Sequence, residues 1–460
     1  MLTRVHARSA VGTVVLVAIA AGTAAAQSGR TLADRLDSIG AGGLRYRGPV
    51  GIVAAVVKGN DTLLLKAYGK ANLEWEVPMA LDAMFEVGSI AKQFAAAAIL
   101  QLRDAGKLSL DDDITKWLPD LDTRGVKVPL RRMLDHTSGL QTGDAGSVFD
   151  PRLTRDSAYL LLKRAPVRFK FPSGEAQAYD DRAFWLVGLV VEKASGMRYE
   201  EYMEKKIFEP LGMKGSMYCN SSLNVPHRAH GYQFANGVFR RPPAVVYALV
   251  FAPGAICSTA GDLVTWLKAL HGGKVLSPDS YSLMTTQAKL ADGTPLQYGM
   301  GIKVGEDYQG RRYIGHGGSA PGFRAEATWY PDAQMAVVVV GNTTGLAAAE
   351  LARELASEVV PPPRPEVKFY MGDPTPFVGK YQYVMGGNRS LSIEVTQSPR
   401  GLALLFNGSR PEPLPWVGDL TFYAGEDVTL TFRRAHGDSG PVIEARLDDG
   451  GNLYIFKKQP

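Results

Sequence analysis

Residues 88–106 read GSIAKQFAAAAILQLRDAG, a Gly-Ser pair followed by an apolar stretch that closes at a second glycine. This pattern predicts a buried helix over Ile90–Ala105, capped by Gly106. Ser89 and Lys92 lie three residues apart, one turn apart on the same helix face. A desolvated lysine can accept the serine proton, and free N–H groups at a helix start favour developing negative charge. The pattern alone also fits a helix N-cap beside a surface lysine.

Strand-like runs lie on both sides of this helix along the sequence, and the middle third of the chain alternates helices with loops. Strands at both ends with helices between them favour one α/β (α+β) domain over residues 35–358. In it an antiparallel sheet is flanked by helices and joined to an all-helical region. The expected elements are strands Val50–Val57, Thr62–Tyr68, Ala325–Tyr330 and Met335–Val340, a turn at 59–61, and a last helix Leu346–Glu358.

Consecutive prolines mark a linker over residues 359–365, because proline is stiff and cannot donate to a strand ladder. Beyond it, short runs of alternating apolar residues lie around 391–395, 428–432 and 453–455, separated by Gly-, Asp- and Asn-rich turns. This pattern predicts a small antiparallel all-β, barrel-like domain over residues 366–460.

The composition is that of an ordinary folded protein. The chain has 460 residues, 45% apolar and 21% charged, with 51 Lys+Arg against 46 Asp+Glu. These values exclude a disordered, collagen-like or coiled-coil chain. The slight positive excess forms no basic stripe, so we expect no nucleic-acid partner. Cys219 and Cys257 can form neither a disulfide framework nor a cysteine zinc site, and whether they pair stays open.

Residues 1–26 have the three parts of a secretory signal peptide. Arg4 and Arg8 supply the positive end, Ala10–Ala21 the apolar core, and Ala24-Ala25-Ala26 an A-x-A-like cleavage site. The apolar core is shorter than the roughly 18–20 residues of a membrane span. We therefore expect an exported protein, periplasmic or secreted, with no stable membrane span after signal cleavage.

A second candidate site is Tyr179-Asp180-Asp181, which precedes an apolar helix over Ala183–Val191. A tyrosine presented on such a loop can relay protons between a serine, a lysine and a leaving group. The same residues also fit an aspartate N-cap beside a packed tyrosine.

A third candidate site is His316-Gly317-Gly318-Ser319, which we expect on an edge-facing strand. Small residues there let a substrate pair with the strand, and a backbone N–H can stabilise an oxyanion. The similar His271-Gly272-Gly273 follows a predicted helix, Asp262–Leu270, and fits a C-cap.

No motif in the sequence implies a metal or a cofactor. His227-x-x-His230 has no carboxylate or cysteine support, and neither H-E-x-x-H nor a phosphate-loop motif occurs. Gly437-Asp438-Ser439-Gly440 fits a hairpin turn. We therefore expect an enzyme without a cofactor.

Taken together and in this order, the three elements resemble the serine β-lactamase and penicillin-binding-protein-like superfamily, closest to its class C β-lactamase, DD-peptidase and esterase branch. The resemblance runs from residue 35 to 358. The C-terminal segment resembles the lipocalin-like β domains appended to some members. Further matching segments are Leu134–Leu140, Pro210–Met213, Ser258–Leu263 and Tyr298–Gly301.

The resemblance implies a β-lactamase/transpeptidase-like fold and a role for each site residue. Ser89 would be the acylated nucleophile, and Lys92 and Tyr179 would share the acid and base work as a coupled pair. Backbone N–H groups of Ser89 and Ser319 would form the oxyanion hole. The substrate-binding residues would be Ser319, His316, Gly318 and Asp181.

Asp181 and His316 depart from the pattern of the family. Asn is usual at position 181, and an ionised Asp cannot donate to a substrate carbonyl and would hold Lys92 in its charged form. Either Tyr179 is then the base, or Asp181 serves another group such as a substrate amine. His316 stands where carboxylate-binding members carry Lys, and a neutral histidine binds a carboxylate less well.

We therefore expect an exported serine hydrolase that acts through a Ser89 acyl-enzyme on small amides or esters, with D-amino-acid peptides as the favoured class. One alternative is a true β-lactamase. Another, of a different class, is a catalytically weak protein that binds cell-wall peptide or penicillin. The expected partner is a small-molecule or peptide substrate, and the oligomeric state stays open.

Overall fold

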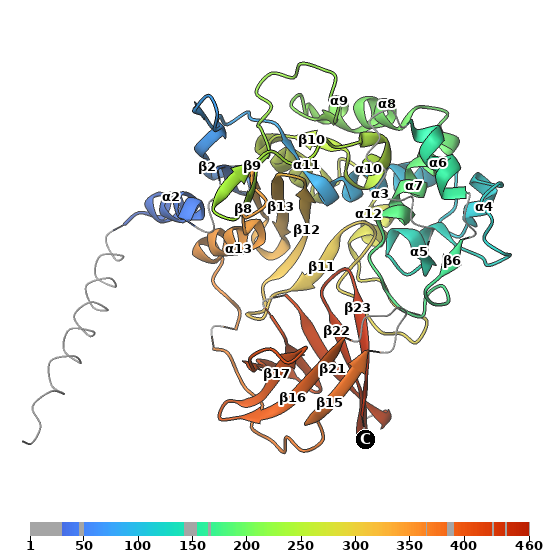
Figure 1. The fold of residues 1–460 in the computed structure, drawn as a ribbon, viewed down its shortest axis with the longest axis vertical. Coiled ribbons are helices and arrows are strands. Elements are labelled where there is room, and N and C mark those ends of the chain that lie inside the picture. Colours follow the sequence, from blue (N-terminus) through green and yellow to red (C-terminus); the bar gives the residue numbers. More distant parts are fainter. Residues whose placement is uncertain are drawn as a thin grey trace, which may run out of the picture.

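The computed structural model describes residues 30–45, 50–141, 154–163, 167–364, 366–383, 391–425, 427–437 and 439–459. The predicted signal segment, residues 1–26, lies outside the described residues. Figure 1 shows an α/β domain and, below it, a separate β domain formed by the C-terminal part of the chain.

A seven-stranded antiparallel sheet forms the centre of the first domain, in the order β11-β12-β13-β14-β1-β2-β3. Its middle strands β14 and β1 pair with each other, so strands from both ends of the domain share one sheet, as predicted. The strands are β1 Gly51–Lys58, β2 Asp61–Asn72, β3 Val77–Pro78, β11 Lys303–Glu306, β12 Arg312–Ala320, β13 Phe323–Tyr330 and β14 Met335–Gly341.

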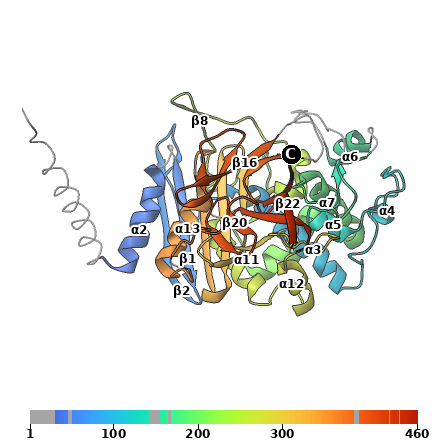
Figure 2. The ribbon, with the colours of Figure 1, turned by 90° about the horizontal axis from the view of Figure 1, so that it is seen from below.

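Consecutive residues along β1 and β14 are buried, and alternate residues of a strand point to opposite sides of a sheet. The sheet is therefore apolar on both faces. On one face lie α2 (Leu32–Gly42) and α13 (Ala348–Val359), and on the other lie α3 (Ala91–Asp104), α7 (Asp181–Ser195) and α11 (Ala260–His271), as Figure 2 also shows. The other helices are α4 Ile114–Trp117, α5 Leu130–Leu134, α6 Arg155–Lys163, α8 Tyr199–Met203, α9 Glu209–Leu211, α10 Tyr247–Gly254 and α12 Pro278–Thr285.

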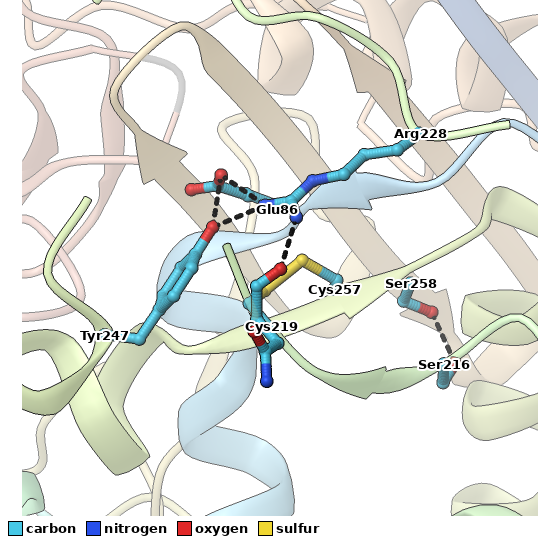
Figure 3. Close-up of a disulfide and its surroundings, with 8 residues drawn as sticks. Glu86, Ser216, Cys219, Arg228, Tyr247, Cys257 and Ser258 are labelled. Carbon is cyan, nitrogen blue, oxygen red and sulfur yellow. Dashed lines mark hydrogen bonds and ion pairs between the residues drawn. A yellow bond between two sulfur atoms is a disulfide. The ribbon is translucent and has the colours of Figure 1, made fainter. Parts of the chain in front are cut away.

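The first domain also contains a small three-stranded sheet, in the order β4-β10-β7. Cys219 and Cys257 form a disulfide within it (Figure 3), which answers the question that the sequence left open. Beside the disulfide, Glu86 accepts hydrogen bonds from Tyr247 at 2.7 Å and Arg228 at 3.3 Å. The strands of this sheet are β4 Phe85–Glu86, β7 Met217–Tyr218 and β10 Ile256–Ser258. Two further two-stranded sheets lie elsewhere, β5 Leu140–Gln141 with β6 Arg168–Phe169 and β8 Gln233–Ala235 with β9 Val238–Arg240.

The C-terminal part forms one nine-stranded sheet, β18-β17-β16-β15-β23-β22-β21-β20-β19, curled as a half-barrel around its own apolar core. The predicted fold class is therefore confirmed for both parts. The strands are β15 Gly379–Tyr383, β16 Ser392–Ser398, β17 Gly401–Phe406, β18 Glu412–Pro413, β19 Trp416–Gly418, β20 Thr421–Tyr423, β21 Thr429–His436, β22 Ser439–Asp448 and β23 Leu453–Lys458.

The two domains are in contact where β22 and β23 meet the first domain near β11 (Figure 1). Leu453 packs against Leu290 and Leu296, and the backbone N–H of Gln297 donates to the Asp448 carboxylate at 2.8 Å. The turn between β22 and β23 is thereby held against the first domain. Among the helices of the described residues, none combines the length and the apolar character that crossing a membrane requires.

Candidate active site

Ser89 and Lys92 lie side by side, as the three-residue spacing predicts. Ser89 belongs to a 3-10 turn, Gly88–Ile90, that leads into α3, and Lys92 lies in the first turn of α3 with its side chain fully buried. Lys92 Nζ donates to Ser89 Oγ at 3.1 Å, to Asp181 Oδ1 at 2.5 Å and to the Pro253 carbonyl at 3.2 Å. An ammonium group has three donors, so all three protons of Lys92 are used.

The second predicted segment also reaches this point. Asp180 is the N-cap of α7 and accepts the N–H of Arg182 at 2.9 Å, so the capping interpretation holds for Asp180. Tyr179 is nevertheless at the site, because Lys92 Nζ lies 4.6 Å from the centre of its ring. Asp181 forms the ion pair with Lys92 expected from its position, and 65% of its side chain remains exposed.

The charges of this cluster are coupled. Burial alone would lower the pKa of Lys92, but Tyr179, in its ionised form, and the Asp181 carboxylate outweigh this and raise that pKa. Burial raises the pKa of Tyr179, although the Lys92 charge opposes this. The resting site therefore holds an ammonium at Lys92 and a neutral phenol at Tyr179.

The third predicted segment is part of β12, and its position differs from the expectation. β12 is not the outermost strand, because β11 pairs with its first half, Arg312–Gly315. The second half, from His316 to Ala320, pairs with β13 on the other side, and β11 does not reach it. The edge-facing character predicted for the His316–Ser319 segment is thus confined to half of the strand.

Two glycines let β12 approach the serine turn. Gly88 has a φ of +54°, and a Cβ there would lie 2.6 Å from the backbone N of Ser319. A Cβ at Gly318 would overlap the carbonyl oxygen of Val87. Only glycine permits both contacts, which bring the backbone of Ser319 against the segment that carries Ser89.

His316 is a neutral, buried histidine. Its Nδ1 lies 2.6 Å from the Gly317 carbonyl, which can only accept, so Nδ1 carries the proton. Nε2 then accepts from the Tyr298 hydroxyl at 3.0 Å. Burial and the nearby Lys92 charge lower the pKa of His316 to about 3. His316 therefore has no cationic charge to offer a substrate carboxylate.

His136 is a site residue to which sequence reasoning gave no role. Its ring stacks on Tyr179 with the centres 4.3 Å apart, and its Nδ1 accepts the backbone N–H of Asp180 at 3.1 Å. Burial, together with the charge of Lys92, lowers its pKa well below the usual value. His136 thus supports the tyrosine loop as a neutral ring. Its backbone has a positive φ of 62°, and it lies in the segment Leu134–Leu140 that matches the family.

Ser89 and Tyr179 open onto a cavity of about 1150 Å³ between β12, β13 and α13. Its lining also includes His316, Gly317, Gly318 and Ser319 of β12, Arg324 and Glu326 of β13, and Glu350, Glu354 and Glu358 of α13. The structure therefore brings all seven predicted site residues to one place, with Lys92 below the surface and Asp181 exposed beside it.

Metal ligands do not gather in the part of the chain that the structure describes, where no three His, Cys, Asp or Glu side chains form a metal-binding group. His227 interacts with Asp82 at 2.6 Å and His230 with Asn72 at 2.7 Å.

Comparisons with known proteins find similar sequences and similar folds. The sequence profile of the beta-lactamase family matches residues 37–360. A penicillin-binding protein of Bacillus subtilis is 26% identical over 62% of this chain and 66% of its own length. A D-aminopeptidase of Gluconobacter oxydans is 26% identical over 85% of this chain and 73% of its own length. The chain thus spans about two thirds to three quarters of these relatives.

Among solved structures, an octameric penicillin-binding protein homologue from Pyrococcus abyssi superposes with a TM-score of 0.64 at 24% identity. The match covers 92% of this chain and 99% of the other, so it extends into the C-terminal domain. At this identity the likeness shows the fold.

Proposed function

The chain belongs to the beta-lactamase family, and we propose that it is a serine hydrolase that acts through an acyl-enzyme on Ser89, with amides and peptides of D-amino acids as its main substrates. The observation that carries the proposal is the meeting of Ser89, Lys92 and Tyr179 at the mouth of one cavity. These are a nucleophile, a candidate base and a proton relay, the groups that acyl transfer requires.

Asp181 supports a substrate that carries an amine. Its carboxylate is largely exposed and lies next to the serine–lysine pair. A D-amino-acid amide has an α-ammonium group one bond from the carbon that bears its reactive carbonyl. Relatives named D-aminopeptidase point to the same substrate class.

The ion pair between Lys92 and Asp181 determines the order of the proton transfers. A substrate ammonium that pairs with Asp181 competes with Lys92 for the carboxylate and lowers the pKa of the lysine. Lys92 then releases a proton to solvent, and the resulting amine accepts the Ser89 proton as Oγ attacks the carbonyl carbon. Backbone N–H groups of Ser89 and Ser319 stabilise the oxyanion. Tyr179 donates a proton to the leaving amine and is reprotonated by Lys92. Water then attacks the carbonyl carbon of the acyl-enzyme, and the same groups transfer protons in the reverse direction until Ser89 is released.

Hydrolysis of D- and L-alanine p-nitroanilides by the full chain tests this proposal, with the Ser89→Ala variant as the control. We expect release of nitroaniline from the D isomer by the wild type alone. Equal hydrolysis by the variant, or a preference for the L isomer, would contradict it.

Export is a further part of the proposal. Its supports are the signal-like residues 1–26 and the Cys219–Cys257 disulfide, since disulfides persist in oxidising compartments. Cell fractionation with intact-mass analysis of the recovered protein tests it. We expect a chain lacking about the first 26 residues outside the cytoplasm, and an uncleaved cytoplasmic chain would overturn this part.

A further inference from the structure

A second cavity, of about 750 Å³, lies next to the β12–β13 turn, which borders it through Pro321 and Phe323. Among the described residues, none lines both this cavity and the catalytic one. The rest of its wall consists of Glu86 on β4 and of residues within the ranges 221–231 and 241–247. It is therefore a separate site, although Glu86 is only three residues from the serine of the catalytic turn.

The charged side chains in the wall of this second cavity are already paired. Glu86 Oε1 accepts hydrogen bonds from the Tyr247 hydroxyl at 2.7 Å and from Arg228 at 3.3 Å (Figure 3). Arg241 donates from Nε to Glu74 at 2.6 Å. A charged ligand would have to displace one of these partners and leave it without a counter-charge. The wall therefore favours a ligand with no net charge.

His230, which also lines the second cavity, is a neutral ring with one free N–H. The amide nitrogen of Asn72 and the guanidinium of Arg241 lie 2.7 and 2.5 Å from its Nδ1, and both can only donate. The orientation of Asn72 is fixed, because its Oδ1 accepts the N–H of Trp75 at 2.7 Å. Burial and the nearby Arg241 charge lower the pKa of His230. Nδ1 is therefore the acceptor, and Nε2 carries the proton.

Two polar atoms of this wall have no hydrogen bond to any described residue. One is Glu86 Oε2, an acceptor, and the other is His230 Nε2, a donor. Neither belongs to the unpartnered side-chain atoms that the described residues seal from solvent, so both remain open to the cavity. An apolar ligand would leave both atoms unpaired. A suitable ligand must therefore offer both donors and acceptors.

Rigid apolar groups surround these two polar atoms. The wall contains four prolines and two aromatic rings: Pro226, Pro242, Pro243, Pro321, Tyr247 and Phe323. Such rings pack closely against a C–H surface of matching shape and lose little conformational entropy in doing so. A sugar ring combines such a C–H face with hydroxyl groups that each donate and accept, and it carries no net charge.

We propose that the second cavity is a binding site for a neutral saccharide. Sugar hydroxyls donate to Glu86 Oε2 and accept from His230 Nε2, while the C–H faces of the rings pack against the prolines. The volume is within the usual range for small-ligand sites, which combine mostly apolar walls with a few placed polar groups. No bond forms or breaks at this site, and the inference does not depend on the proposed hydrolase function.

Calorimetric titration of the full chain tests this site with β-1,4-linked trimers of glucose, glucosamine and glucuronic acid, which differ in charge. N-acetyl-trialanine amide, an uncharged peptide, represents another class of ligand. We expect the glucose trimer to bind at one site per chain. Its affinity should exceed that of each charged trimer and of the peptide by at least about tenfold, because those ligands leave polar groups of the wall unpaired.

Glu86→Gln should weaken binding of the glucose trimer at least about fivefold. Tyr247 and Arg228 both donate to Oε1 and hold the amide oxygen there, so an amide nitrogen replaces the acceptor Oε2. Asp82→Asn is the matched control, because this carboxylate pairs with His227 at 2.6 Å and lies outside the lining of the cavity. It should bind like the wild type.

Two further variants locate the site. Ala244 is an exposed residue of the wall, and Ala244→Trp should fill the cavity and abolish binding. Ser89→Ala should bind like the wild type, because the catalytic cavity is separate. If Glu86→Gln does not fold, Ala244→Trp decides, since the change is at the surface.

Three results would overturn the inference. The first is that the glucose trimer does not bind, or binds no more tightly than a charged trimer or the peptide. The second is binding that Ala244→Trp retains. The third is binding that Ser89→Ala loses, which would place the saccharide in the catalytic cavity. Binding is measured without turnover, so a failure of the proposed function is a separate result.

Discussion

The side-chain oxygen of Asn452 accepts a hydrogen bond from the backbone N–H of Tyr179 at 2.9 Å, which joins the C-terminal domain directly to the active-site cavity. The next residue, Leu453, donates its N–H to the Gln177 carbonyl at 3.2 Å. The Asp449 carboxylate accepts the N–H of Asn452 at 2.7 Å and shapes the turn. The second domain therefore positions the tyrosine loop of the first.

Asn452→Ala should lower kcat by about five- to twentyfold. The partly buried N–H of Tyr179 then loses its acceptor, and the Tyr179 ring is no longer held in place. The domain should stay docked through Gln297 and Asp448. Asn407→Ala is the matched control, since it removes a similar bond to Ser392 in another turn of the same domain. Steady-state kinetics at saturating D-alanine p-nitroanilide measure the change, and wild-type kcat in Asn452→Ala would refute the positioning role.

Asp181→Asn should change two reactions in opposite directions. Turnover of D-amino-acid amides should fall at least about tenfold, because the substrate ammonium loses its counter-charge. Acylation by penicillin should become faster, because Asn can donate to a side-chain carbonyl and no longer holds Lys92 charged. Parallel assays of amide hydrolysis and penicillin adduct formation report both, and a change of the two rates in the same direction would exclude this role for Asp181.

For a neutral ester, kcat/KM of the wild type should be highest at alkaline pH. The pKa of Lys92 is raised, so the protonated, inactive form of this lysine persists at neutral pH and kcat/KM rises as pH increases. In Asp181→Asn the burial of Lys92 remains without the carboxylate charge, so its pKa falls and the rise moves to lower pH. A substrate that bears an ammonium group should cause the same displacement in the wild type.

Profiles of kcat/KM against pH for an uncharged ester and for a D-amino-acid amide check these shifts. Coincident profiles for both substrates and both enzymes would show that Asp181 does not control the base.

Replacing Cys219 and Cys257 by serine should destabilise the protein by about 3–4 kcal/mol, the chain-entropy value for a loop of this size. The two cysteines are 38 residues apart. Strand β10, which contains Cys257, also holds the serine segment, since the Ile256 carbonyl accepts the N–H of Val87 at 3.1 Å. Denaturant unfolding measures the loss, and a reductant should lower wild-type stability while leaving the double variant unchanged. A loss below about 1 kcal/mol would show that the bond contributes little.

The sheet could be predicted because its information is local. Apolar runs of the right length predict β1 and β14, and a three-residue spacing on one helix predicts that Ser89 and Lys92 meet. Tyr179 and His316 could be selected only by the resemblance of the ordered motifs. A helix N-cap explains the residues around Tyr179 equally well, and the similar His271-Gly272-Gly273 fits a helix C-cap.

Asn452 and His136 escaped prediction for a different physical reason. Asn452 is 273 residues from Tyr179, and its role depends on how the two domains dock. His136 acts through stacking that the local sequence does not reveal. The extent of β11, which covers only half of β12, depends likewise on tertiary packing.

Intact-mass spectrometry of the full chain with a fluorophosphonate probe, run beside Ser89→Ala, tests the central claim most directly. We predict that the wild type gains one phosphonyl group, mapped to Ser89, and loses amide hydrolysis in step with labelling. Ser89→Ala should fold normally, remain unlabelled and lose at least about a thousandfold in kcat. Labelling of the variant, or an active wild type that never reacts at Ser89, would contradict the account.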